Sequence, residues 1–260
     1  MRTGCASFIR YHGMRHPSDM GAVEIEAFLS YLAVGRSVSV NTQRTALNAL
    51  VFLYGQHLRR EPMILEFKLA KPARRIPVVF TDDEARAVIA ELSGIHQLAA
   101  RLMYGSGLRI SECVRLRVKD IDFGMNTIIV RGGKGNKDRA TLLSRSCADD
   151  LQAQLRYVQS LFDFDRANQL AGVYLPYALE RKYPNAGVEL AWQYLFPSAR
   201  PVEDPRTDIK RRHHLLPRSV QKAVKIAIRR AGIHKQAGCH TLRHYVYSRT
   251  MSPNTIMHSA

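Results

Sequence analysis

The sequence is poor in acidic residues, in cysteine and in long apolar runs. Its 260 residues include 22 Asp and Glu against 39 Lys and Arg, so the formal net charge is +17. The 4 cysteines lie far apart without a C-x-x-C pair, which excludes a disulfide framework and a zinc ribbon. No apolar run reaches the roughly 18 residues of a membrane span, and the charged N-terminus is unlike a secretory signal. We expect a soluble cytoplasmic protein with reduced thiols.

What the sequence does contain is enough apolar material for a sizeable core. Hydrophobic residues make up 46% and charged residues 23%, a balance that excludes a disordered polycation. The excess positive charge predicts an anionic partner, either nucleic acid or a membrane surface. Because nothing in the sequence indicates membrane insertion, we take nucleic acid as the working hypothesis and expect no membrane partner.

The N-terminal part, residues 1–64, predicts a small helical domain. Apolar residues fall at helical spacing from Val23 to Leu32. A longer helix is predicted by an apolar stripe that must face other helices, formed by Leu47, Leu50, Val51, Tyr54 and Leu58. Residues 65–79 then lose the apolar period and carry two prolines and several cations, which is typical of a basic linker.

The remainder, residues 80–260, predicts a second and mainly helical domain. Thr81 and Glu84 form a capping box, and helices are expected over 97–104 and 146–170. Two β-type runs over 126–131 and 138–143 flank a glycine-rich turn, which predicts a hairpin. After an irregular segment over about 171–216, a helix begins at Pro217 and ends near Gly232. The fold class is therefore mainly α with a small antiparallel β-hairpin sheet (α+β).

One stretch concentrates the positive charge. Residues 206–235 contain ten Lys and Arg against one acid, a net charge of +9. On the predicted helix after Pro217, Lys222, Lys225 and Arg229 share one side, opposite an apolar stripe. A solvated helix face is the ordinary interpretation of such residues, but charge of one sign at this density favours a surface that contacts phosphate.

Three separate features could each hold a phosphate. Arg109 follows a Gly-Ser-Gly turn, Lys134 lies at the predicted hairpin tip, and His240 and Arg243 belong to a His-x-x-Arg-His cluster that ends at His244. Each feature alone is equally typical of a surface or capping residue or of a local hydrogen-bond network. His240 and His244 beside Cys239 also have metal-ligand spacing, but Arg243 between them would repel a dication, so we expect no metal.

The order and spacing of these features resemble those of the tyrosine recombinase family. The motifs that carry the resemblance are Tyr104-Gly-Ser-Gly-Leu-Arg-Ile-Ser-Glu-Cys113, Val118-Lys-Asp-Ile-Asp122, Gly133-Lys-Gly-Asn-Lys-Asp-Arg139 and His240-Thr-Leu-Arg-His244. Within the family, the segments Ala178-Leu-Glu-Arg-Lys-Tyr-Pro-Asn-Ala186, Trp192-Gln-Tyr194 and Arg211-Arg-His-His214 resemble the extra insertion of the integron integrases.

The resemblance implies a C-shaped, two-domain protein with a DNA breaking-rejoining catalytic fold. Residues 1–64 would be the core-binding (SAM-like) domain without its first helix, and the insertion would occupy about 171–216. In the family a tyrosine attacks a DNA phosphodiester and forms a 3′-phosphotyrosine link, with no metal or other cofactor. The implied partner is recombination-site DNA, including folded single-stranded hairpins, bound by a homo-tetramer in a bacterial, nucleoid-associated location.

The implied catalytic residues are Arg109, Lys134, His240 and Arg243, supported by Glu112 and His244. Two planar, permanently charged guanidinium groups suit the negative charge that grows on the phosphate oxygens in the transition state. Lys134 would protonate the leaving 5′-oxygen, and His240 is suited to proton transfer at neutral pH. Glu112 either orients Arg109 or forms an ordinary surface ion pair with it.

The cations expected to contact DNA are spread over both domains. They are Arg44, Lys71, Arg74, Arg75, Lys137, Arg139, Lys210, Arg211, Arg212, His213, His214, Lys222, Lys225 and Arg229. For His213 and His214, packing inside the protein is the other interpretation that the sequence leaves open.

After His244 the sequence departs from the family pattern. The expected nucleophilic tyrosine, about thirty residues beyond the second arginine, has no counterpart in a chain that ends at Ala260. Tyr245 and Tyr247 are too close to Arg243 on one helix for in-line attack, although an intact partner protomer could deliver a tyrosine. We therefore expect a C-terminally truncated chain with impaired tetramer assembly. Two hypotheses remain, namely an active recombinase and a catalytically incomplete remnant that only binds DNA.

Overall fold

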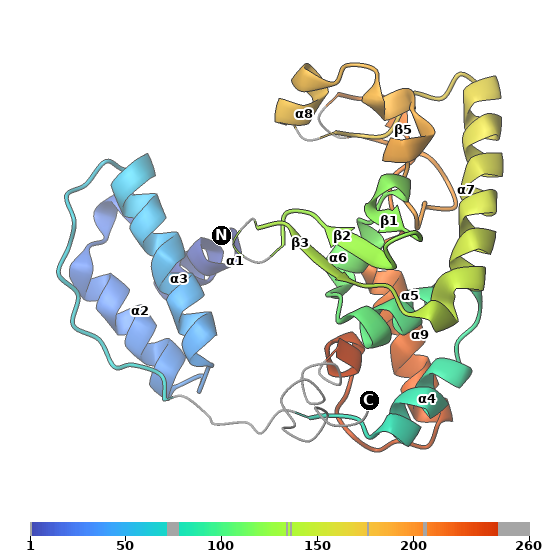
Figure 1. Cartoon of the computed structure of the whole chain (residues 1–260). Helices are drawn as coiled ribbons and strands as arrows, with labels where there is room; N and C mark the ends of the chain where they lie inside the picture. Colours follow the sequence, from blue (N-terminus) through green and yellow to red (C-terminus); the bar gives the residue numbers. More distant parts are fainter. Residues whose placement is uncertain are drawn as a thin grey trace. The chain divides into compact units, whose positions relative to one another are not determined.

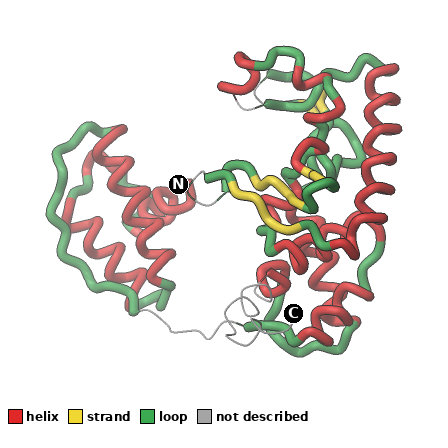
Figure 2. The backbone as a smooth tube through the Cα atoms, viewed as in Figure 1, coloured by secondary structure: helices red, strands yellow, loops and turns green. Residues whose placement is uncertain are grey.

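The computed structural model describes residues 2–71, 78–133, 135, 137–175, 177–204 and 207–243. The chain divides into two compact units, Met1–Ile76 and Pro77–Ala260. Both units are mostly helical, and the strands belong to the second unit (Figure 2). The fold class expected from the sequence is confirmed.

The first unit is built from three α-helices and one π-helical turn. In chain order they are α1 (Arg2–Tyr11), α2 (Ala22–Val34), α3 (Val40–Phe52) and the π turn Leu53–His57, which directly continues α3 (Figure 1). A short 3₁₀ turn, Pro17–Asp19, joins α1 to α2. The two helices predicted from apolar spacing are confirmed by α2 and α3, whereas α1 was not expected.

Aromatic packing explains the first unit's core. Phe8 of α1 is fully buried and meets the ring of Phe28 edge-on, with 5.5 Å between the ring centroids. Leu50 and Tyr54 are also buried, as the apolar stripe predicted. Val51, however, is 58% exposed. Helix α1 is therefore stabilised by tertiary packing of Phe8.

The extended chain after the π turn packs on the first unit. The side chain of Gln43 donates to the carbonyl of Lys68 (2.7 Å) and accepts from the backbone N–H of Ala70 (2.9 Å). The backbone N–H of Glu66 donates to Glu26 Oε1 at 2.8 Å. Residues 66–70, which the sequence predicts to belong to a linker, are thus held against α2 and α3 by paired backbone groups.

The second unit is mostly helical, and residues 239–243 are helical in addition to the α-helices labelled in Figure 1. The labelled helices are α4 (Asp82–Ala90), α5 (Gly94–Ser106), α6 (Ile110–Val114), α7 (Ala148–Ala167), α8 (Tyr177–Lys182) and α9 (Pro217–Arg230). The predicted capping box is confirmed, since Thr81 Oγ1 accepts from the backbone N–H of Glu84 at 3.2 Å and the Glu84 carboxylate accepts from the backbone N–H of Thr81 at 2.8 Å. No helix in the described part of the chain is long and apolar enough to cross a membrane.

A three-stranded antiparallel sheet lies beside α6 (Figure 1). Strands β2 (Thr127–Val130) and β3 (Arg139–Leu142) pair as the predicted hairpin, with Val130 opposite Arg139. The short strand β1 (Ile121–Asp122) adds a third strand, which the sequence pattern did not predict. Because Val130 and Arg139 are the last pair of the ladder, the described loop residues 131–133 and 137–138 lie at the end of the sheet.

The predicted insertion over 171–216 is largely irregular, as expected, and lies at one end of α7 (Figure 1). It contains α8, several 3₁₀ turns and a two-stranded sheet of β4 (Val202–Glu203) and β5 (Lys210–Arg211). It is joined to the rest of the unit by backbone hydrogen bonds, from Leu195 N–H to the carbonyl of Leu116 (2.8 Å) and from Val118 N–H to the carbonyl of Gln193 (3.0 Å).

Helix α9 has the two faces that its sequence predicts. Its apolar stripe, which includes Val220, Val224, Ala227 and Ile228, is buried in the core of the second unit, where α9 packs on α5. Proline occupies the first turn, where its missing N–H costs no helical hydrogen bond. The opposite face is exposed and carries the cations.

Candidate functional site

Arg109 is positioned by the turn that joins α5 to α6. Helix α5 is closed by Gly107 in the left-handed conformation (φ 64°), and Arg109 is the N-cap residue of α6. The carbonyl of Ser106, within this turn, accepts a hydrogen bond from the Thr141 hydroxyl of β3 at 2.9 Å. Since a residue with a Cβ is strained at such a φ, glycine at 107 allows the tight reversal that brings Arg109 next to the sheet.

Glu112 binds Arg109 from inside the protein. Its carboxylate accepts from Arg109 Nη1 at 2.7 Å and from the backbone N–H of Arg109 at 2.7 Å. It also accepts two hydrogen bonds from Arg139, Nη1 at 2.9 Å and Nη2 at 2.8 Å. The Glu112 side chain is only 6% exposed. The interpretation of this pair as an ordinary surface ion pair is therefore wrong, and Glu112 orients Arg109.

The protonation of Glu112 follows from these contacts. Burial by itself would raise the pKa of the carboxyl group, but the hydrogen bonds from Arg139 and from the backbone and side chain of Arg109 outweigh burial. Together they lower the pKa of Glu112 from 4.5 to about 2. The group is an anion at neutral pH, so it holds two guanidinium groups by charge-assisted hydrogen bonds.

Acid should weaken the fold through this carboxylate. A pKa held about 2.5 units below its unfolded value stabilises the native state by about 3 kcal/mol above pH ~5, and this stabilisation is lost as pH falls toward 2. We expect the wild type to lose about 3 kcal/mol more than Glu112→Gln between pH 5 and pH 2, because glutamine has no proton to take up. Urea unfolding of both proteins across this range measures the difference. Parallel pH profiles of the two proteins would contradict the assignment.

Arg243 lies next to the same turn. It is 8% exposed, and its Nε–H donates to the carbonyl of Gly107 at 2.8 Å. It belongs to a helical segment over 239–243, in which Thr241 Oγ1 accepts from the backbone N–H of Gly238 at 3.1 Å. Residues far apart in the sequence, Arg109 and Arg243, are thus brought together at one glycine turn, as their predicted pairing requires.

Both arginines line a groove of about 970 Å³. His240, which is exposed, lines it too, together with the cationic side of α9. The basic lining residues are Arg109, Arg218, Lys222, Lys225, Arg229, His240 and Arg243. No carboxylate is among the described lining residues. A groove with cations on several sides and no acid in its described lining is suited to an anion, which makes it the candidate functional site.

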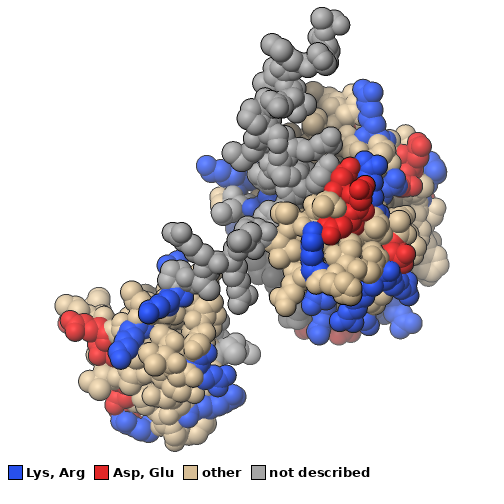
Figure 3. All heavy atoms as spheres, turned by 90° about the horizontal axis from the view of Figure 1, so that it is seen from below, with Lys and Arg blue, Asp and Glu red and all other residues tan. Residues whose placement is uncertain are grey.

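The cationic side of α9 is longer than expected. Arg218 stands one turn before Lys222 and lines the groove with Lys222, Lys225 and Arg229. The spacing of these four residues, i, i+4, i+7 and i+11, would have identified Arg218 from the sequence, but the predicted set began at Lys222. Figure 3 shows more Lys and Arg than Asp and Glu on the surface of each unit in that view.

These cations make the affinity for DNA depend on salt. Replacing Lys225 with glutamine should reduce the slope of log affinity against log salt concentration by about 0.9 for duplex DNA, because one fewer phosphate is neutralised. Arg156→Gln is the matched control, since Arg156 is exposed on α7 and is not part of the groove lining. Native gels over a series of salt concentrations give both slopes. Equal slopes for the two variants would place Lys225 outside the DNA contact.

Several predicted residues lie outside the described residues, namely Lys134, His244, Arg74 and Arg75, and so do Tyr245 and Tyr247. On either side of Lys134 the hairpin loop is closed by hydrogen bonds from Gly132 N–H to Asp138 Oδ1 (2.8 Å) and from Gly133 N–H to the carbonyl of Lys137 (3.0 Å). Of the remaining predicted DNA contacts, those with exposed side chains are Arg44, Lys71, Lys137, Lys210, Lys222, Lys225 and Arg229.

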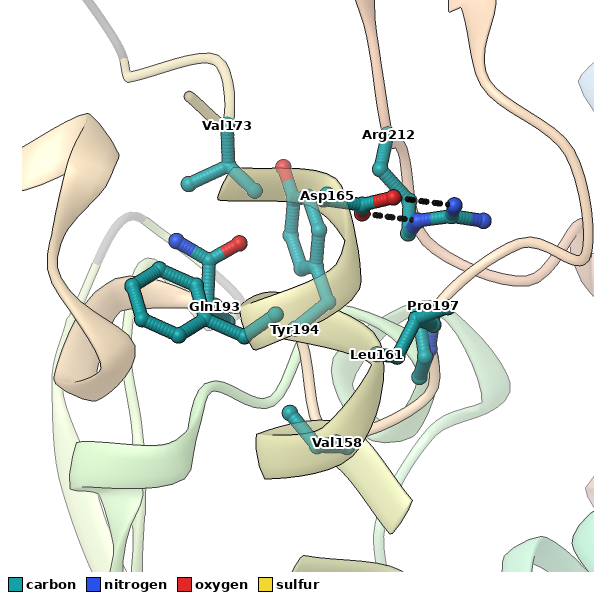
Figure 4. Close-up of a pocket in the computed structure, with 9 residues that line it drawn as sticks. Val158, Leu161, Asp165, Val173, Gln193, Tyr194, Pro197 and Arg212 are labelled. Atoms are coloured by element: carbon teal, nitrogen blue, oxygen red, sulfur yellow. Dashed lines mark hydrogen bonds and ion pairs between the residues drawn. The ribbon is translucent and has the colours of Figure 1, made fainter. Parts of the chain in front are cut away.

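The position of Arg212 contradicts the prediction that the basic run over 210–214 faces DNA. Its side chain is 9% exposed and forms a two-point ion pair with Asp165 of α7, at 2.5 and 2.6 Å. A third nitrogen, Nη1, donates to the carbonyls of Ser198 (2.8 Å) and Ala199 (3.1 Å). Figure 4 shows the pair beside the small pocket between α7 and the insertion. The prediction that Arg212 contacts DNA is wrong, because its N–H groups are used inside the protein.

The neighbours of Arg212 are also structural. Arg211 donates to the carbonyl of Gly172 at 2.7 Å, and its side chain is 17% exposed. His214 is 9% exposed, and its ring meets that of Tyr194 edge-on, with the centroids 5.2 Å apart. Burial lowers the pKa of both His213 and His214, which favours the neutral rings. For Arg211 and His214 these contacts contradict the predicted DNA contact, and for His214 they favour the alternative of packing. His213 is half-buried, so both of its interpretations stay predictions.

Arg139 was also expected to contact DNA, but both of its terminal nitrogens bind Glu112.

No group of three or more His, Cys, Asp or Glu side chains that could hold a metal occurs in the part of the chain that the structure describes. Cys239 is 8% exposed, and burial raises the pKa of its thiol to about 11, so the thiolate that a metal requires is disfavoured.

The groove is the candidate site of a mainly helical protein, and comparison with known proteins identifies the family. The model of the phage integrase family matches residues 79–254, and that of the phage integrase N-terminal SAM-like domain matches residues 4–63. The chain therefore belongs to the phage integrase family, the tyrosine recombinases. An integrase/recombinase of Escherichia coli is 49% identical over 239 residues, which cover 92% of this chain and 71% of that protein. The tyrosine recombinase XerA of Thermococcus kodakarensis is 29% identical over 196 residues, 69% of this chain and 68% of that protein.

Solved structures with the same fold are more distant in sequence. The XerH site-specific recombinase bound to its palindromic difH substrate matches with a TM-score of 0.53 and 19% identity, over 95% of this chain and 65% of that chain. The Tn1549 transposon integrase in complex with circular intermediate DNA matches with a TM-score of 0.53 and 14% identity, over 96% and 88%. These similarities confirm the predicted fold.

Proposed function

We propose that this chain is a site-specific DNA recombinase that holds a DNA phosphodiester between Arg109 and Arg243. The observation that carries the proposal is the hydrogen bond from Arg243 Nε to the carbonyl of Gly107, two residues before Arg109. It brings the two guanidinium groups to one groove, beside the cationic side of α9. The names of similar proteins, an integrase/recombinase and XerA, support the same activity.

The proposed reaction is strand exchange through a covalent intermediate. A tyrosine hydroxyl attacks the phosphorus, the bond to the 5′-oxygen breaks, and a 3′-phosphotyrosine and a free 5′-hydroxyl result. His240 moves the proton at the nucleophile, and Lys134 protonates the leaving 5′-oxygen. A 5′-hydroxyl of another strand then reverses the step and releases the tyrosine. Arg109 and Arg243 stabilise the charge that develops on the non-bridging oxygens in both steps.

For the type of recombinase we propose an integron integrase that acts on folded single-stranded hairpins. The support comes from the insertion, whose sequence carries the resemblance to that subgroup. There Tyr183 is 43% exposed, with its ring centroid 5.9 Å from that of Trp192, and Lys182 lies next to it. Exposed aromatic rings beside cations suit the stacking of unpaired bases near a phosphate backbone, as a folded single strand offers.

A second candidate function is DNA binding without cleavage. The observation that favours it is that no tyrosine belongs to the described lining of the groove. We propose in this case that the chain occupies recombination sites and competes with an intact integrase. The first candidate includes assembly of a homo-tetramer on DNA, as expected from the family, whereas the second does not require it.

One experiment tests both candidates. The purified chain is incubated with a labelled, folded recombination-site hairpin and with a fully paired duplex control, and each mixture is run on native and on denaturing gels. A denaturant-resistant protein–DNA adduct establishes cleavage and excludes the second candidate. Retardation on the native gel without an adduct supports binding alone. Equal retardation of hairpin and duplex contradicts the integron type, and no retardation at low salt contradicts both candidates.

A further inference from the structure

Arg139 connects the hairpin to Glu112, and the proposed reaction gives this residue no role. It is the first residue of β3, and it donates to Glu112 Oε1 at 2.9 Å and to Oε2 at 2.8 Å. Arg109 donates to the same Oε1 at 2.7 Å. One carboxylate therefore serves two guanidinium groups that come from different elements, the N-cap of α6 and the hairpin.

This sharing changes the net charge of the cluster to which Arg109, a residue of the groove lining, belongs. The Glu112 side chain is 6% exposed, whereas those of Arg109 and Arg139 are 32% and 35% exposed. Two cations and one anion leave a net charge of +1 on the cluster. If Glu112 were paired with Arg109 alone, the pair would be neutral and its attraction for a phosphate would be much weaker. Arg139 thus compensates the carboxylate that orients Arg109.

The surroundings of Arg139 hold it in this place. A methyl group added at Gly133 would lie 2.9 Å from Arg139 Nη1 and 3.0 Å from the carbonyl of Lys137, both closer than ordinary contact. Glycine at this position lets the hairpin loop close directly over the Glu112–Arg139 pair. At the other end of the loop, Arg131 is paired instead with Asp120, at 2.8 Å. Arg131 and Arg139 therefore have separate carboxylate partners.

We propose that Arg139 is a positioning residue, which shares Glu112 so that Arg109 is oriented and still presents net positive charge to a phosphate. The inference rests on the proposed function in taking the anion to be a DNA phosphate. It assigns Arg139 no contact with the reacting atoms. Because the role is electrostatic, removing Arg139 and removing Glu112 have opposite effects on the affinity of the groove for an anion.

The test uses the full chain and inorganic phosphate as the probe. The Nε–H signal of Arg109 in nitrogen-15 NMR spectra, assigned with Arg109→Lys, is followed during a phosphate titration. We expect Arg139→Gln to bind phosphate about tenfold more weakly than the wild type, and Glu112→Gln/Arg139→Gln to return to within about threefold of it. Arg139→Lys retains the charge and should also stay within about threefold. Arg131→Gln is the matched control and should leave the affinity unchanged.

A purely structural role predicts a different pattern. It would lower the melting temperature of Arg139→Gln without changing the phosphate affinity of the folded protein, and the double variant would be worse than either single one. Either result overturns the inference, as does a wild-type Arg109 signal that does not respond to phosphate. If Arg139→Gln does not fold, the Glu112→Gln variant alone tests the inference. It is expected to bind phosphate at least threefold more tightly than the wild type. Failure of the proposed function is seen separately, as absent DNA retardation on the native gel.

Discussion

Replacing Asp165 with alanine is expected to lower the free energy of unfolding around the insertion by about 3–5 kcal/mol. The substitution leaves the guanidinium group of Arg212, which is 9% exposed, without its anion. The carbonyls of Ser198 and Ala199 still accept hydrogen bonds from it, but they carry no compensating charge. A buried charge that has lost its partner is much more costly than the loss of a pair exposed to water.

The chain offers its own probe for this effect. Its 1 tryptophan is Trp192, in the insertion, so urea unfolding followed by tryptophan fluorescence reports on the affected region. Asp150→Ala is the matched control, because the Arg101–Asp150 pair has side chains that are 35% and 49% exposed and should contribute about 1 kcal/mol or less.

A double variant separates the loss of charge balance from the loss of packing. Asp165→Leu combined with Arg212→Met should recover much of the stability lost in Asp165→Ala, since it removes both charges and keeps apolar volume. If Asp165→Ala were no more harmful than Asp150→Ala, the ion pair would not anchor the insertion on α7.

The second large effect is expected at Arg243. Replacing it with lysine should lower the rate of adduct formation by about 10²–10³-fold, comparable to the loss of one preorganised oxyanion donor. The guanidinium group of Arg243 has its Nε–H on the carbonyl of Gly107 and its plane fixed by burial. A lysine ammonium is a point charge that cannot reproduce this fork-shaped arrangement of donors.

The affinity for DNA should change by less than about threefold in Arg243→Lys, because the charge is kept and the cations of α9 are intact. Arg218→Lys is the matched control. Arg218 is exposed on the same groove, where a point charge suffices, and its rate should stay within about threefold of the wild type. The measurement is adduct formation with time on denaturing gels at saturating protein. A rate for Arg243→Lys within tenfold of the wild type would contradict its placement in the phosphate clamp.

Much of the fold could be predicted from local sequence. The capping box at Thr81, the β2–β3 hairpin and the two faces of α9 follow from residue types and periods that act over a few positions. Helix α1 could not be predicted in this way, since its stabilising contact is between Phe8 and Phe28, distant in the sequence. Strand β1 is only two residues long and exists through its pairing with β2.

The residues of the candidate site were likewise predicted only in part. Arg109, His240 and Arg243 were correctly grouped from their motifs, and the groove brings them together. The assignment of Arg212 to DNA was wrong, and Arg139 binds a carboxylate that the sequence did not indicate. An arginine that binds a carboxylate and one that binds a phosphate have the same identity in a sequence. The carboxylate partners of Arg139 and Arg212 are Glu112 and Asp165, 27 and 47 residues away.

By itself the sequence determined the charge of the protein, its helical class and the family to which it belongs. These properties follow from the composition, from the short apolar periods of helices and strands, and from motifs that can be recognised without knowing which residues are in contact. Only the tertiary structure decided which cations face the groove and which are paired with carboxylates inside the protein. That choice depends on where the folded chain places each carboxylate, because a buried guanidinium group must be compensated by a nearby anion or remain in water.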